Sequence, residues 1–67
     1  MKFAERLWQE RIANGYTQVY IAKDWTVSKV AVSNGERGAK EPDYQTLIDL
    51  AKLFNRSTDY MLGLTDK

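Results

Sequence analysis

The sequence predicts an all-α protein, a compact bundle of five short helices within one domain that covers residues 1–67. Three observations support this fold class. Apolar residues recur at intervals of three and four, which is the spacing of one face of a helix. No stretch alternates apolar and polar residues as a half-buried strand would. Residues that commonly cap helices (Ser, Thr, Asp, Asn and Gly) stand at the ends of the periodic segments.

The composition fits a small packed domain and argues against several kinds of site. A hydrophobic fraction of 43%, with two Trp, four Tyr and two Phe, favours a globule over disorder. The chain has no His and no Cys, so the commonest metal ligand, the commonest acid-base group and the thiol nucleophile are absent. We expect no metal, no cofactor and no enzymatic activity. No apolar run is long enough for a membrane span, and the charged start MKFAERLWQE is unlike a signal peptide, so the expected location is the cytoplasm.

The first helix is predicted from the spacing of Phe3, Leu7 and Ile12, which recur at roughly helical intervals among charged residues. Asn14-Gly15 is expected to end it, because glycine readily adopts the left-handed conformation of the position after a helix. Trp8 is predicted to lie on the outer side of this helix.

The central stretch, residues 17–38, predicts two short helices joined by a turn. Thr17 and Ser28 each precede a helix, where a hydroxyl can accept a hydrogen bond from an otherwise unpaired backbone N–H group. Residues 25–27 form the predicted turn, and Gly38 ends the second of the two helices. The side chains predicted to face inward are those of Ile21, Ala22, Trp25, Ala31, Val32 and Gly35.

Two further helices are predicted after the loop that contains Pro42. Asp43 caps the fourth helix, where its negative charge suits the positive end of the helix dipole. Ser57 caps the fifth, and Asn55 and Gly63 are the expected stops. The predicted core residues of this half are Leu47, Leu50, Ala51, Phe54, Met61, Leu62 and Leu64.

Charge is distributed unevenly along the chain, although the net charge is only +1. Residues 17–40 carry four basic and two acidic side chains, whereas residues 41–67 carry three basic and five acidic ones. A mildly basic centre is compatible with one face of the protein meeting a polyanion.

Several short pieces of the sequence follow one another in a recognisable order. They are Gly15-Tyr16-Thr17-Gln18, Ile21-Ala22-Lys23, Val27-Ser28-Lys29, Val32-Ser33, Glu36-Arg37-Gly38, Pro42, Thr46-Leu47, Leu50-Ala51-Lys52 and Ser57-Thr58-Asp59-Tyr60-Met61-Leu62-Gly63. In this order and spacing the chain resembles the phage repressor and Cro-type (XRE-like) helix-turn-helix domains, from about residue 3 to residue 65. The resemblance implies a lambda-repressor-like fold with the motif at about 17–36 and a DNA-reading helix at about 28–36.

The resemblance also implies which side chains meet the bases. Lys29, Val30 and Asn34 would face base edges in the major groove, with Ser28 and Ser33 at the margins. Their chemistry agrees with that role, since lysine can donate to guanine, asparagine can pair with adenine and valine can pack on a thymine methyl group. The alternative interpretation is that these residues are ordinary solvated surface.

A second group of residues has implied roles outside the bases. Gln18, Arg37 and Lys40 would contact the phosphate backbone of double-stranded DNA. Arg11 and Glu36 would form an internal salt bridge between the first helix and the end of the third.

Four positions depart from the family pattern. Thr26 stands where the turn usually has glycine, so a positive φ there would be strained. Gly35 replaces a large apolar residue, Trp25 replaces Leu or Val, and Arg56 replaces a buried Val. We hypothesise that Trp25 occupies the volume vacated at Gly35, which would be an exchange of large for small across two helices.

The predicted function is that of a sequence-specific transcriptional regulator, acting as a homodimer on a pseudo-palindromic operator. The alternative is a redesigned or repurposed helix-turn-helix scaffold that serves as a protein-interaction or oligomerisation module with little DNA binding. Apolar residues at expected surface positions, namely Trp8, Val19 and Tyr20, fit that alternative.

Overall fold

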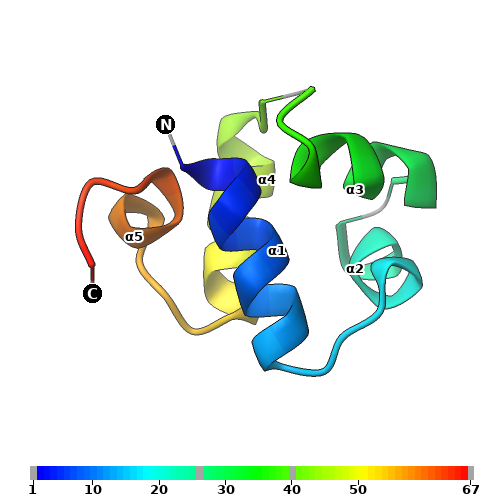
Figure 1. Cartoon of the computed structure of the whole chain (residues 1–67), viewed down its shortest axis with the longest axis horizontal. Coiled ribbons are helices and arrows are strands. Elements are labelled where there is room, and N and C mark those ends of the chain that lie inside the picture. The colour runs from blue at the N-terminus through cyan, green and yellow to red at the C-terminus, as the bar shows by residue number, and fades with distance from the viewer. Residues whose placement is uncertain (1, 26, 40, 67) are drawn as a thin grey trace.

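The computed structural model describes residues 2–25, 27–39 and 41–66, and these residues form five α-helices (Figure 1). The helices are α1 (Phe3–Ala13), α2 (Gln18–Trp25), α3 (Lys29–Glu36), α4 (Tyr44–Leu53) and α5 (Thr58–Leu62). The predicted all-α fold class is confirmed. The predictions made for Thr26 and Lys40 concern positions outside the described residues. Within the described ranges no helix has the length and apolar character needed to cross a membrane.

Apart from Trp25, which was assigned to the turn but is the last residue of α2, the helices begin and end where the capping residues predicted. The side chains of Thr17, Ser28, Asp43 and Ser57 accept hydrogen bonds of 2.9–3.2 Å from backbone N–H groups three residues later. After α3 and α4 the backbone is left-handed, with φ of 75° at Gly38 and 56° at Asn55. Glycine adopts this conformation without strain, and asparagine tolerates it better than most residues. Local sequence therefore sets both ends of α3 and of α4.

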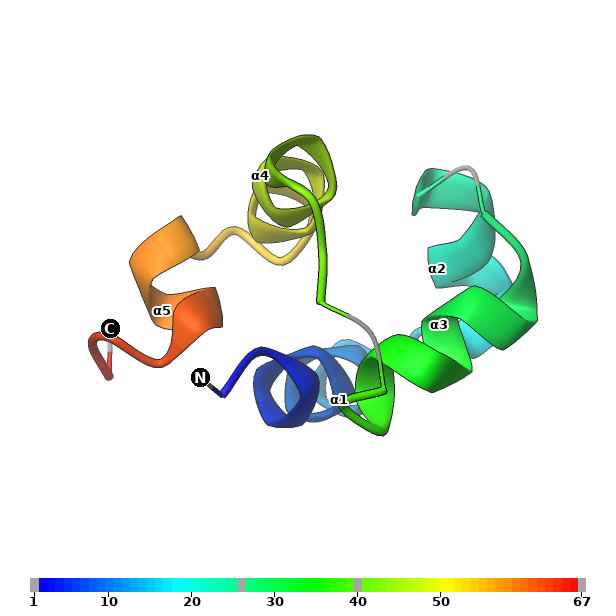
Figure 2. The ribbon, with the colours of Figure 1, turned by 90° about the horizontal axis from the view of Figure 1, so that it is seen from above.

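Helix α1 lies between the two halves of the fold. It packs against α3 and against α5, while α2 packs against α3 and α4. In Figure 1, α3, the following loop and the start of α4 lie along the upper side of the bundle. Figure 2 looks down on that side and shows the N-terminal end of α4 and the length of α3 facing the viewer. One face of the protein is thus formed by α3 and the beginning of α4.

The core draws on every helix. Its buried apolar residues are Phe3, Leu7, Ile21, Ala22, Val32, Leu47, Leu50, Ala51, Phe54, Tyr60 and Met61. Burying a large apolar side chain contributes about 1.5–3 kcal/mol. This small core therefore supplies most of the apolar stabilisation that a domain of this length can gain.

Two predicted core positions are wrong, because Ile12 and Leu64 are 52% and 70% exposed. The inward side of α1 includes Leu7 and Glu10. Five residues beyond Leu7, the helix has turned by about 140° away from that side. Glu10, three residues after Leu7, lies on the inward side of α1, whereas Ile12 does not. Leu64 follows Gly63, whose left-handed backbone ends α5.

The Trp25 indole lies against Gly35, as the exchange of large for small predicted. A Cβ atom at Gly35 would lie 3.6 and 3.7 Å from two indole carbons and 3.4 Å from Leu7 Cδ2. The indole Nε1 donates a 2.6 Å hydrogen bond to Thr46 Oγ1 in α4. Trp25 and Leu7 therefore occupy the space beside Gly35.

A buried carboxylate joins α1 to the end of the chain. Glu10 accepts hydrogen bonds from the Tyr60 hydroxyl at 3.1 Å and from Arg56 Nε at 3.2 Å. The guanidinium groups of Arg6 and Arg56 lie 4.2 and 4.4 Å from the centroid of the Tyr60 ring. Hydrogen bonding with Tyr60 is the main cause that raises the pKa of the Arg6 guanidinium, with burial acting in the opposite direction and Asp66 adding a smaller upward effect. Arg56, which replaces a buried valine in the family pattern, lies exposed over this cluster.

The exchange between Trp25 and Gly35 can be tested with a double-mutant cycle. We expect Trp25→Leu to cost on the order of 2 kcal/mol by opening a cavity, and Gly35→Leu to cost about 1–3 kcal/mol by overpacking. The double variant should lose at least about 1 kcal/mol less than the sum, because the new leucine at position 35 fills the space the indole leaves. Urea unfolding followed by circular dichroism measures the three losses. Additive losses would show that the two side chains do not share one space.

Candidate nucleic-acid interface

Helix α3 is held by one face and exposed on the other. Ser28 caps its N-terminus, with its hydroxyl accepting from Ala31 N at 3.2 Å. Val32 and Gly35 are buried on the inner side. On the outer side Val30 is 67% exposed. A valine so exposed gains nothing from the fold, which leaves it available for an apolar contact with a partner.

The structure brings the predicted base-contact residues together on this outer side. Ser28 and Lys29 are exposed around the first turn, as Val30 is, while Ser33 and Asn34 are half-buried one turn later. Side chains three and four residues apart are neighbours on a helix surface, so Val30 adjoins both Ser33 and Asn34. The five side chains can therefore meet one segment of a groove.

Asn34 is already held by a neighbour. Its Oδ1 accepts a short hydrogen bond from Arg37 Nη2, at the C-terminal end of α3. Because Arg37 carries no acceptor, this contact fixes the carbonyl oxygen of the amide on the Arg37 side and distinguishes it from the NH2 group. The two residues were assigned different roles, base contact and phosphate contact, and the structure places them in one pair.

The predicted Arg11–Glu36 pair is present and is bidentate. Arg11 Nε lies 2.6 Å from Glu36 Oε2, and Arg11 Nη2 donates to Oε1 at 3.2 Å. The side chains are only 13% and 6% exposed. Arg11 Nη1 also donates to the Tyr16 carbonyl at 3.1 Å. This pair fastens the end of α3 to α1.

Gln18 is drawn into the same cluster. Its Nε2 donates to Glu36 Oε1 at 3.2 Å, at the start of α2. A side-chain amide has two N–H donors, so one remains for a phosphate oxygen. Gln18 and Arg37 therefore lie close to the same end of α3, whereas the third predicted phosphate contact, Lys40, lies outside the described residues.

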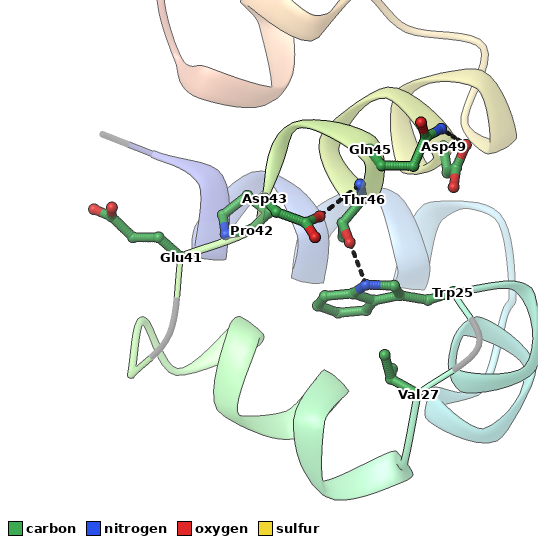
Figure 3. A pocket seen from close by; sticks show the side chains of 8 residues that line it. All are labelled: Trp25, Val27, Glu41, Pro42, Asp43, Gln45, Thr46 and Asp49. Carbon is green, nitrogen blue, oxygen red and sulfur yellow. Dashed lines mark hydrogen bonds between the residues drawn. The ribbon is translucent and has the colours of Figure 1, made fainter.

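A cleft of about 470 Å³ opens between the helix-turn-helix turn and the start of α4 (Figure 3). It is lined by Trp25, Val27, Glu41, Pro42, Asp43, Gln45, Thr46 and Asp49. Three of these residues, Glu41, Asp43 and Asp49, are acidic. In the part of the chain that the structure describes, no group of three acidic residues is arranged to hold a metal ion. The described residues that line the cleft come from the end of α2, the turn, the loop before α4 and α4 itself, and not from α3.

Tyr44, which the sequence patterns did not single out, is the most exposed of the large apolar side chains among the described residues, at 87%. It is the first residue of α4, a helix whose N-terminal end lies on the side of the bundle that also carries α3 (Figure 2). An aromatic residue directly after the capping Asp43 is the signal that could have drawn attention to it.

These features define a class of protein. Two helices joined by a tight turn, the second exposed along its outer side and fastened at its far end, form a helix-turn-helix unit, here within a five-helix bundle. Residues 9–61 match the family described as "Helix-turn-helix", and the chain belongs to this family.

Particular relatives agree with this assignment. The HTH-type transcriptional regulator ImmR of Bacillus subtilis (strain 168) is 41% identical over 63 residues, which are 94% of this chain and 50% of ImmR. The chain spans about half the length of the curated relatives it matches. The crystal structure of the P22 c2 repressor with a synthetic operator has a TM-score of 0.82 and 34% identity, over 88% of this chain and 89% of that one. The solution structure of its DNA-binding domain has a TM-score of 0.83 and 33% identity, over 97% and 88%. The predicted phage-repressor type of fold is confirmed.

We expect the Arg11–Glu36 pair to contribute strongly to the stability of the fold. We expect Glu36→Gln to destabilise the fold by about 3–5 kcal/mol, because the change leaves the buried Arg11 guanidinium without its counter-ion. Asp66→Asn is the matched control, since Asp66 pairs with Arg6 while being 99% exposed, and should change stability by less than about 1 kcal/mol. Thermal unfolding followed by circular dichroism compares the two. Equal losses would contradict the assigned role of Glu36.

Proposed function

We propose that the protein is a sequence-specific DNA-binding transcriptional regulator, with α3 entering the major groove. The observation that carries this proposal is the division of α3 into a clamped inner side and an exposed outer side with base-compatible side chains. Family membership and the likeness to the P22 c2 repressor, whose crystal structure contains a synthetic operator, support it.

In this proposal the outer side of α3 reads the bases. Lys29 donates to guanine O6 or N7, and Val30 packs on a thymine methyl group. Asn34 pairs with adenine, its amide being oriented beforehand by Arg37. Ser28 and Ser33 lie at the margins of this surface. Because these side chains stand on one clamped helix, they meet the groove as a fixed set.

Contacts to the DNA backbone supply much of the affinity. Gln18, Arg37 and Lys40 are the proposed phosphate contacts. Each phosphate neutralised by a cation releases counter-ions, so binding should weaken steeply as salt increases. With a net charge of only +1, the attraction comes from this local surface and not from the field of the whole protein.

We further propose that the protein acts as a homodimer on a pseudo-palindromic operator. Two half-sites read by one dimer lie about one DNA turn apart, so the dimer must place both α3 helices on one side of the duplex. Tyr44 and Ile48 are exposed one turn apart on α4, and Leu64 is exposed just after α5. The exposed apolar side chains of Tyr44 and Ile48 on α4, with Leu64 after α5, are the residues proposed for the dimer face. The regulator would act in the compartment that holds the DNA, the cytoplasm of a cell without a nucleus.

Base contact can be tested with a duplex that the wild-type protein selects from a random-sequence pool. Lys29→Ala and Asn34→Ala should each weaken binding to that duplex by about 5- to 150-fold, because each removes a contact worth about 1–3 kcal/mol. Lys52→Ala is the control. Lys52 is an exposed basic residue in the last turn of α4, at the end of that helix away from α3. Fluorescence anisotropy at a fixed salt concentration measures the affinities.

Two outcomes would contradict the proposed base contacts. If both variants bind the selected duplex as wild type does, the assignment of α3 is wrong. If the wild-type protein forms a tight oligomer that is indifferent to DNA and to salt, the protein-interaction alternative replaces the proposed function.

The dimer face can be tested with a charge placed in its centre. Ile48→Glu should shift the protein towards monomer in sedimentation experiments and abolish cooperative binding to a two-half-site duplex, because a carboxylate would be buried without a partner. Trp8→Glu makes the same kind of change on the exposed side of α1 and should leave the association state unchanged. Dissociation by Trp8→Glu alone would move the dimer face to α1.

A further inference from the structure

We propose that Trp25 is a positioning residue for sequence reading, and that its hydrogen bond to Thr46 fixes the indole on which the C-terminal half of α3 rests. This inference depends on the proposed function, because it concerns how α3 is held in the major groove. It assigns to Thr46, a residue of α4 on the inner side of the bundle, an effect on which DNA sequence is bound.

The first step is the contact between the indole and α3. Gly35 has no side chain, so α3 contributes no apolar group of its own at this position of its inner side. Leu7 Cδ2 and the Cη2 and Cζ3 atoms of Trp25 fill the space instead, at 3.4, 3.6 and 3.7 Å from where a Cβ atom would lie. The last turn of α3 therefore rests partly on a side chain that belongs to α2, beside Leu7 of α1. If the indole moves, the support of this turn changes.

The second step is that packing alone does not fix the indole. Trp25 is only half-buried and lines the cleft of about 470 Å³. Figure 3 shows the ring with Val27 on one side and Thr46 on the other. A tryptophan enclosed on all sides has one orientation, whereas one beside a cleft has room for others. The 2.6 Å hydrogen bond from Nε1 to Thr46 Oγ1 selects the observed orientation.

The third step is that Thr46 itself is firmly placed. It is 7% exposed, in the first turn of α4. Its backbone N–H donates to Asp43 Oδ1 at 2.9 Å, the capping bond that begins the helix. A chain of contacts thus runs from the cap of α4 through Thr46 and Trp25 to Gly35, and it links the two elements that share the upper side of the bundle in Figure 1.

The functional consequence follows from the different tolerances of the two kinds of DNA contact. Hydrogen bonds to base edges require accurate placement of the helix, while phosphate contacts carry no sequence information and accept more movement. A loosened α3 should therefore lose affinity for its preferred sequence more than affinity for DNA in general. The ratio of the two affinities is the quantity that Thr46 and Trp25 should control.

The experiment compares Thr46→Val with Thr46→Ser. Valine keeps the shape of threonine but removes the acceptor, whereas serine keeps the acceptor. We expect Thr46→Val to lower the ratio of affinities for the selected duplex and for a scrambled duplex by about 3- to 30-fold. Thr46→Ser should retain the wild-type ratio to within about two-fold. The chain has two tryptophans, Trp8 and Trp25. Both variants are therefore also made in a Trp8→Phe background, in which the fluorescence emission comes from Trp25 and reports the loss of its hydrogen bond.

A loss of stability must be separated from a loss of positioning. Met61→Val removes volume from the core at α5, outside the Thr46–Trp25–Gly35 chain of contacts, and serves as a destabilised control. It should lower the fraction of folded protein without changing the affinity ratio of the folded molecules.

Each result decides between the inference and its alternatives. A Thr46→Val protein with the wild-type ratio would overturn the inference, as would an equal fall in the ratio for Met61→Val, or a Thr46→Ser protein that behaves like Thr46→Val. If the wild-type protein selects no preferred duplex, the proposed function fails and the inference fails with it. A duplex that is selected by the wild-type protein and bound equally well by Thr46→Val overturns the inference alone.

Discussion

The Glu36 carboxylate is the interaction on which the arrangement of the helix-turn-helix unit depends. It receives two hydrogen bonds from Arg11 and one from Gln18, so one buried charge ties the end of α3 to α1 and to the start of α2. A buried carboxylate is tolerated only when its hydrogen bonds and charge are compensated, as they are here. The same cluster fixes the C-terminal end of α3, while the first turn of α3 stays exposed. Because one end is held, this short helix can present its other end to solvent in so small a protein.

Helix α1 takes part in two such buried polar links. Neighbouring residues, Glu10 and Arg11, point to opposite halves of the fold: Glu10 holds Tyr60 and Arg56, and Arg11 holds Glu36. Each link replaces apolar area that a chain of this size cannot supply. The half containing α5 and the half containing α3 are thereby joined through one helix.

Sequence patterns predicted the helix limits well and the polar links poorly. The capping residues Thr17, Ser28, Asp43 and Ser57 act through bonds to backbone three residues away, so their effect is local and can be predicted. Glu10 could not be predicted, because a charged residue at an inward position disturbs the apolar periodicity and its partners stand some fifty residues away. Arg11–Glu36 came from the family resemblance and not from spacing. The base and phosphate contacts stay predictions, since no nucleic acid tests them, and the pairing of Asn34 with Arg37 required a structure.

The charge around α3 constrains how DNA can approach. The cleft beside the turn is lined by Glu41, Asp43 and Asp49, so a phosphate strand following that side would meet three carboxylates. Near the C-terminal end of α3, Gln18 and Arg37 offer donors. A duplex that places its backbone near these donors and keeps its phosphates away from the cleft fits the electrostatics of both sides. Trp25 stands at the boundary, with one part of the indole against Gly35 and another at the cleft. In the proposed complex, the residue that supports α3 would therefore stand beside the acidic cleft and apart from the side chains proposed to contact DNA.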